Sequence, residues 1–227
     1  MIQPRVEAYI VLELGKEQAR SARLSQEMVG STMEDRDIRR TGTGDITYST
    51  AARRFHWWTV ALLAVQIPVG LYMAYRGNTL NLWDGLTNAL YSSHKMLGIT
   101  ILLLILARLI YRLSHGAPPD EPTLEWWQKG AAHLNHWGLY LMLLVVPILG
   151  YVGISLYPAL DIFGLFSLPG VVAPNQDAAA RVLYWHWLGA LAIVLLVGVH
   201  VAAALFHYFI RKDGVLRRMW VRAGRLS

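Results

Sequence analysis

Histidines at helical spacing are the residues of this chain that are best placed to do chemistry. Of eight histidines, three (His186, His200 and His207) fall in one apolar stretch, where ionisable side chains are costly and usually functional. At ~100° and ~1.5 Å per residue of an α-helix, His200 lies within ~40° of the face of His186 and ~21 Å along the axis. The chain has no cysteine, which excludes thiolate-bound zinc, iron–sulfur clusters and covalent c-type haem.

Four apolar stretches must position these side chains, at about 55–75, 90–111, 132–154 and 182–210. Each reaches the roughly 20 residues that a helix needs to cross a bilayer. Only 16% of the residues are charged, against about 25% in an average soluble domain. The apolar runs are continuous and four strands cannot close a barrel, so transmembrane strands are excluded. We therefore expect an all-α fold, an integral membrane four-helix bundle.

The basic residues predict how the chain is oriented. They cluster before the first span, around the loop between the second and third, and after the fourth. By the positive-inside rule both termini are expected in the cytoplasm. The net charge of +6 then belongs to the flanks of the spans, and no nucleic-acid partner is expected.

Three segments are expected along the chain. Residues 47–219 form the membrane domain, between a flexible cytoplasmic N-terminal tail, 1–46, and a short cytoplasmic C-terminal tail, 220–227. The N-terminal tail has no apolar core of a signal peptide. As an alternative, translation starts at Met28 or Met33 and the earlier residues are not part of the native protein.

The predicted topology sorts four histidines into two pairs by depth. His56 opens the first span and His200 approaches the end of the fourth, both on the inner side. His94 opens the second span and His186 lies near the start of the fourth, both on the outer side. Two b-type haems between the helices, each with two axial imidazoles, require such pairs. We expect these four histidines to be the iron ligands.

The other histidines leave alternatives open. His136 opens the third span on the inner side and is the main alternative ligand for the inner haem. His133, His136 and His207 are otherwise expected to form hydrogen bonds at the inner interface or to contact quinone or haem propionates. His115 falls in a loop and is expected to be solvated.

Two glycines support the haem prediction. Gly70 and Gly150 follow His56 and His136 by 14 residues each, which brings both to the depth of the outer pair. A flat macrocycle needs backbone clearance there, although ordinary packing of small residues is the alternative.

Two flanking features are less specific. Arg53 and Arg54 are expected to anchor the first span, with contact to haem propionates as the alternative. The apolar outer stretch 155–181 is expected to cap the bundle, with docking of an outer partner as the alternative.

Several motifs, in this order, resemble the bacterial cytochrome b561 family and within it the superoxide oxidase-like members. They are Arg54-Phe55-His56-Trp57, Ser93-His94-Lys95, Ala132-His133-Leu134-Asn135-His136, Trp185-His186, Gly198-Val199-His200 and His207-Tyr208-Phe209. The resemblance covers residues 47–219, and the N-terminal tail departs from the family, whose members start close to the first span.

The resemblance implies a protein of the bacterial inner membrane with two low-spin, non-covalent haems b, held by His94 with His186 and by His56 with His200. It also implies that His207 lies near a quinone site on the cytoplasmic side. The implied function is electron transfer to or from the quinone pool, in the superoxide oxidase version from superoxide on the outer side to ubiquinone. The alternative is a haem-b anchor subunit that passes electrons between a peripheral dehydrogenase or hydrogenase and quinone.

Overall fold

The computed structural model of the chain describes residues 20–21, 24–26 and 47–220. The chain divides into two compact units, Met1–Asp45 and Ile46–Ser227. The five residues described in the first unit are helical. The expected N-terminal tail otherwise lies outside the described residues, as does the expected C-terminal tail beyond residue 220.

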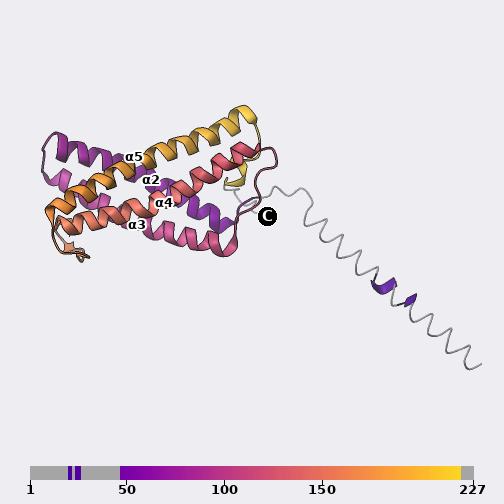
Figure 1. Ribbon diagram of the computed structural model, residues 1–227, viewed down its shortest axis with the longest axis horizontal. Helices are drawn as coiled ribbons and strands as arrows, with labels where there is room; N and C mark the ends of the chain where they lie inside the picture. Colours follow the sequence, from indigo (N-terminus) through magenta and orange to yellow (C-terminus); the bar gives the residue numbers. More distant parts are fainter. Residues whose placement is uncertain (1–19, 22–23, 27–46, 221–227) are drawn as a thin grey trace, which may run out of the picture. The chain divides into compact units, whose positions relative to one another are not determined.

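Four helices make up the second unit (Figure 1), and each is long and apolar enough to cross a membrane. They are α2 (Thr50–Ala74), α3 (Gly85–His115), α4 (Trp126–Leu156) and α5 (Gln176–Phe206). The π-helical turns η1 (Tyr75–Thr79) and η2 (His207–Arg211) extend α2 and α5, and a 3-10 turn, η3, covers Leu216–Arg218. The predicted four-helix membrane bundle is confirmed. The helices run beyond the apolar stretches because the polar and aromatic residues at their ends continue the same backbone hydrogen bonds.

Local signals explain where the helices begin. The side chains of Ser49, Asp84 and Asn175 each accept a hydrogen bond from a backbone amide in the first turn of α2, α3 and α5. Pro68 and Pro147 lie inside α2 and α4 without ending them. Prolines are tolerated in membrane helices, where neighbouring helices and local adjustments satisfy the freed backbone groups.

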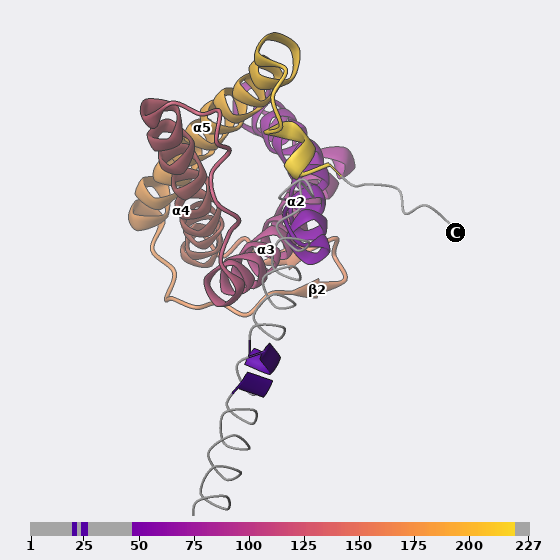
Figure 2. The same cartoon turned by 90° about the vertical axis from the view of Figure 1, so that its right-hand side faces the viewer.

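The helices pack as two pairs, α2 with α3 and α4 with α5, and α3 also packs against α4. Figure 2 shows the four helices along the bundle, with the two pairs on opposite sides. Large apolar side chains such as Leu103, Ile110 and Leu195 remain exposed on the helices, as expected for surfaces that face lipid. The buried apolar core contains Leu63, Ile101, Ile105, Tyr140, Leu143, Val146 and Ile193.

An ion pair stabilises the turn between α2 and α3. Arg76 Nη2 lies 2.6 Å from Asp84 Oδ2, and Arg76 Nε donates to the hydroxyl of Thr87 at 2.9 Å. The backbone N–H of Thr87 donates to Asp84 Oδ1 at 2.9 Å. This amide and, second, the guanidinium of Arg76 lower the pKa of Asp84 to about 2.

The segment between α4 and α5 forms a small antiparallel hairpin of β1 (Asp161–Ile162) and β2 (Phe166–Ser167), which the sequence did not indicate. Lys95 Nζ donates to the backbone carbonyl of Ala159 at 3.2 Å, and the amide of Phe163 donates to Ser92 Oγ at 3.0 Å. Ile162 is fully buried. The hairpin is therefore tied to the first turns of α3, next to His94.

Candidate cofactor-binding site

The pair that was predicted for the outer side, His94 and His186, joins α3 to α5. The ring centres of His94 and His186 are 6.0 Å apart. His186 Nδ1 lies 2.8 Å from the carbonyl oxygen of Val146 in α4. Because a carbonyl only accepts, Nδ1 carries the proton, and the lone pair of Nε2 is free for a ligand. The Nδ1 atom of His94 is buried and has no hydrogen-bond partner in the described part of the chain.

Gly70 and Gly150 lie directly against this pair, at the depth that the 14-residue spacing predicts. A Cβ atom at Gly70 would come within 2.9 Å of His94 Cε1. A Cβ atom at Gly150 would come within 2.9 Å of His186 Cε1 and 3.0 Å of its Nδ1. Real Cβ atoms do not approach other atoms this closely, so each imidazole occupies space that only glycine leaves open.

The inner site brings three histidines together from three helices. The ring centre of His200 on α5 is 6.1 Å from that of His56 on α2 and 5.3 Å from that of His136 on α4. Within residues 20–21, 24–26 and 47–220, no three histidine or acidic side chains are grouped to hold a bare metal ion. The arrangement therefore favours pairwise ligation of a larger group over a compact three-ligand metal centre.

Two polar residues at these sites were missed by the sequence reasoning. Arg108 of α3 lies 3.3 Å from His56 Nδ1 through its Nη2 atom and stacks over the ring of Tyr140. From the sequence, Arg108 was one of the basic residues around the loop between the second and third spans, and no contact with His56 was predicted for it. Gln66 of α2 donates to the carbonyl of His94 at 3.1 Å and lies 3.4 Å from His94 Nε2 through the same nitrogen. The Oε1 atom of Gln66 is buried and forms no hydrogen bond with a described residue. Both residues lie inside apolar stretches of the sequence, where a charged or amide side chain indicates a functional site, and this signal could have identified them.

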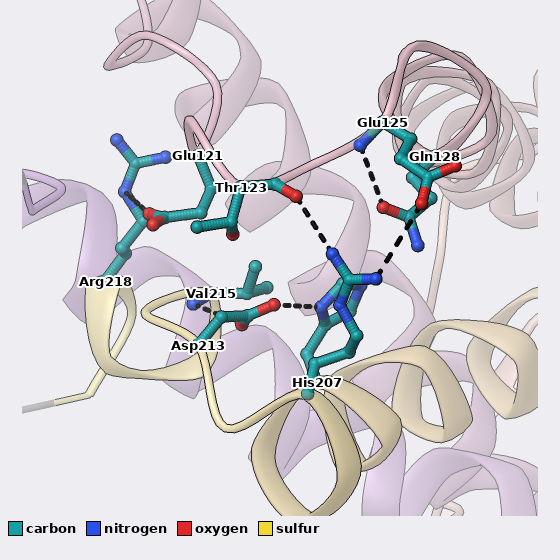
Figure 3. Close-up of polar contacts among 9 residues, drawn as sticks. Glu121, Thr123, Glu125, Gln128, His207, Asp213, Val215 and Arg218 are labelled. Carbon is teal, nitrogen blue, oxygen red and sulfur yellow. Dashed lines mark hydrogen bonds and ion pairs between the residues drawn. The ribbon is translucent and has the colours of Figure 1, made fainter.

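His207 begins η2 and is paired with an aspartate (Figure 3). Its Nδ1 lies 2.5 Å from Asp213 Oδ2, and both side chains are largely buried. Asp213 is held in turn, because its Oδ1 accepts from the amide of Val215 at 3.1 Å.

The loop between α3 and α4 braces this end of the bundle. Arg211 donates to the carbonyl of Thr123 at 3.0 Å, and Arg218 lies 3.7 Å from Glu121 (Figure 3). The segment that follows His207 is thereby tied to a loop more than 80 residues earlier in the sequence.

The remaining histidines lie apart from the two pairs. His133 is exposed and 3.2 Å from Asp120. His115 is exposed, as expected, but the prediction that it falls in a loop is wrong, because it is the last residue of α3. Its ring centre lies 4.2 Å from that of Tyr111, on which it stacks. Neither side chain is in ring contact with the four paired histidines.

The two arginines before His56 also lie apart from it. Arg53 donates to the carbonyl of Trp220 at 3.1 Å. Arg54 is exposed on α2, and a separation of two residues places it ~160° around the helix from His56. The anchor prediction for Arg54 is therefore favoured over contact with a cofactor between the helices.

Comparison with known proteins decides the family. Residues 47–222 match the prokaryotic cytochrome b561 family. The chain belongs to the prokaryotic cytochrome b561 family. This cytochrome is 30% identical over 176 residues to cytochrome b561 homolog 2 of Escherichia coli K12. The aligned residues cover 76% of this chain and 90% of the relative. It is 35% identical over 130 residues to the probable superoxide oxidase CybB of Yersinia pestis. This alignment covers 56% of this chain and 72% of the relative.

Family membership makes the cytochrome a dihaem four-helix membrane protein that transfers electrons. The residues present fit two haems b. Each of two levels of the bundle has a pair of imidazoles with centres about 6 Å apart, and the outer level has glycines where a side chain would meet the imidazoles. The tautomer of His186, set by Val146, leaves the nitrogen that a metal needs.

Proposed function

We propose that His94 and His186 bind one haem b and that His56 and His200 bind the second. If both imidazoles of a pair held one metal ion, each through a nitrogen about 2 Å from it, ring centres about 6 Å apart would leave room for that ion. The separations of 6.0 and 6.1 Å agree with this value. The shorter separation of 5.3 Å between His136 and His200 favours His56 as the inner ligand.

We propose further that the cytochrome carries electrons across the inner membrane to the quinone pool, as a superoxide:ubiquinone oxidoreductase. The observation that carries this proposal is the presence of two histidine pairs on one bundle, with their α5 members ~21 Å apart along the helix. Bound haem b supplies a reversible one-electron couple. Two superoxide anions would lose one electron each and leave as two molecules of oxygen. One ubiquinone would take up the two electrons and two protons to become ubiquinol.

The proposed orientation has both termini in the cytoplasm, as the basic residues before α2 and after α5 favour. The pair of His94 and His186 then faces the outer side, where superoxide would arrive. The pair of His56 and His200 faces the cytoplasmic side, where quinone would be reduced. The relative named probable superoxide oxidase supports this direction.

In this proposal His207 contacts the quinone. Asp213 accepts from Nδ1 of His207 at 2.5 Å and so fixes the ring and its tautomer. The other ring nitrogen, Nε2, can then exchange a proton with a quinone oxygen. Arg108, beside His56, adds a positive charge that favours negatively charged groups of a cofactor and the reduced state of the inner site.

Stopped-flow mixing of the purified cytochrome with superoxide tests this function. We expect the absorption spectrum of the reduced b-type cytochrome to appear after mixing with superoxide. Added ubiquinone should then restore the oxidised spectrum. A cytochrome that binds both haems but is not reduced by superoxide would overturn the superoxide reaction. Failure of ubiquinone to reoxidise it would overturn the quinone step.

The outer hairpin favours a second candidate function, that of an anchor subunit for a peripheral dehydrogenase or hydrogenase. Leu165 at its tip is 80% exposed, and Phe163 and Phe166 are about half exposed, which is typical of a docking surface. Copurification from native membranes distinguishes the two functions. A stable catalytic partner would favour the anchor, and a cytochrome that oxidises superoxide alone would favour the autonomous enzyme.

A further inference from the structure

A hollow of about 470 Å³ lies on the outer surface of α2, near the first turns of this helix. Its walls are Thr50, Ala51, Arg54, Phe55, Trp58 and, from α3, Leu104. Arg54 and Trp58 stand two residues before and after His56, so each lies ~160° around the helix from the haem-facing histidine. The hollow therefore opens away from the interior of the bundle and toward the lipid.

Arg54 brings an uncompensated charge to this hollow. In the described part of the chain its guanidinium has no hydrogen-bond or ion-pair partner, whereas the neighbouring Arg53 donates to Trp220 and Thr50. The lining contains no acidic residue. A guanidinium in this setting binds phosphate through short, charge-assisted hydrogen bonds.

The depth of the lining residues matches a phospholipid. Arg54 lies ~6 Å along α2 from Thr50, where the helix begins, and Trp58 lies ~6 Å deeper. Trp58 is 64% exposed, as is typical of an aromatic side chain at the membrane interface. Arg54 is then level with the headgroups, and Phe55, ~1.5 Å deeper, and Trp58 continue the lining toward the acyl chains.

The hollow is already formed by contacts between α2 and α3. The ring of Phe55 lies 5.8 Å from that of Tyr111, whose hydroxyl is 2.9 Å from Ser49 Oγ. These contacts hold the wall in position before a ligand arrives, so little ordering entropy is lost on binding.

We propose that this hollow binds one anionic phospholipid, with the phosphate on Arg54 and an acyl chain along Phe55, Trp58 and Leu104. Phosphatidylglycerol fits because Arg53 and Arg54 together present positive charge, which a choline headgroup would repel. The site is separate from the haem and quinone sites, and it depends on neither the electron donor nor the orientation of the chain.

Native mass spectrometry of the haem-loaded cytochrome in mild detergent tests the proposal, with phosphatidylglycerol and phosphatidylcholine titrated in parallel. We expect one phosphatidylglycerol per chain at low lipid concentration and about tenfold weaker binding in Arg54→Gln, which loses the charge-assisted contact. Arg217→Gln is the matched control, because Arg217 is an exposed arginine at the same end of the bundle outside the hollow. It should bind as the wild type does.

A second variant, Trp58→Leu, and competition by ubiquinone test the lipid site independently of Arg54. Trp58→Leu should weaken binding while leaving the b-type spectrum unchanged, and the same spectrum verifies that Arg54→Gln is folded. Equal binding by wild type and Arg54→Gln, equal loss in Arg217→Gln, or equal affinity for the two lipids would each overturn the proposal. Displacement of the lipid by ubiquinone would also overturn it, because the hollow would then belong to the quinone.

Discussion

Replacement of Gly150 by alanine is the sharpest test of the outer site. The added methyl group would meet His186 Cε1 at 2.9 Å, whereas carbon atoms in contact lie about 3.5–4.0 Å apart. The imidazole must therefore move by about 0.6 Å or more. It cannot move freely, because its Nδ1 is bonded to the carbonyl of Val146 at 2.8 Å.

The expected loss of haem affinity in Gly150→Ala follows from two energetic costs. Overpacking by one methyl group costs about 1–3 kcal/mol, and weakening a hydrogen bond costs about 1 kcal/mol. A loss of about 2 kcal/mol in the affinity of the outer site corresponds to a roughly 30-fold weaker binding of its haem. The methyl group of Gly70→Ala would meet His94 at the same distance. No described residue forms a hydrogen bond with Nδ1 of this ring, and its Nε2 has only a long contact of 3.4 Å with Gln66 Nε2, so the effect should be smaller.

The assay is the haem-to-protein ratio of the purified variants, with the b-type spectrum resolving the two haems. We expect Gly150→Ala to fall from two haems toward one, with the inner haem retained. Gly138→Ala is the control in the same helix, since its methyl group would make only an ordinary contact at 3.5 Å with a leucine side chain. Two haems with an unchanged spectrum in Gly150→Ala, or equal losses in Gly138→Ala, would refute the reasoning.

Three further predictions concern the inner site, the quinone end and the outer turn. His56→Ala should lose one haem while His136→Ala keeps two, as measured by haem content, and the reverse pattern would make His136 the ligand. Asp213→Asn should slow quinone reduction at least tenfold because it releases the ring of His207, and superoxide-driven haem reduction measured in the same variant should be unchanged. The pKa of Asp84 is lowered to about 2, so its contribution to stability is present above its ordinary value near 4 and is lost as the pH falls toward 2. Thermal melting should accordingly show wild type more stable than Asp84→Asn at pH 5, with most of this difference lost near pH 2. A difference at pH 2 as large as that at pH 5 would contradict this.

Much of the architecture follows from local properties of the sequence. Four apolar stretches predicted four spans because the length of a helix and the thickness of a bilayer are both fixed. The depths of His94 and His186 followed from their positions within those spans. The depth of Gly70 and Gly150 followed from a helical period of 14 residues, and the contacts of both glycines with the outer imidazoles agree with it.

Other features could not be predicted because they depend on how the helices are rotated and ordered around the bundle. The sequence placed both His56 and His136 at the depth of His200, and only the packed helices give their different ring separations of 6.1 and 5.3 Å. The partly buried position of Arg108 beside His56 was missed for the same reason.

The sequence by itself thus determined the class of the protein, the number of its spans and the histidines at each depth. Apolar length and helical period suffice for these, since both act along a single helix. Tertiary structure alone decided that the carbonyl of Val146 holds His186 and that Arg108 lies beside His56. Each of these contacts joins segments whose relative orientation is set by packing, and no periodicity within one helix encodes it.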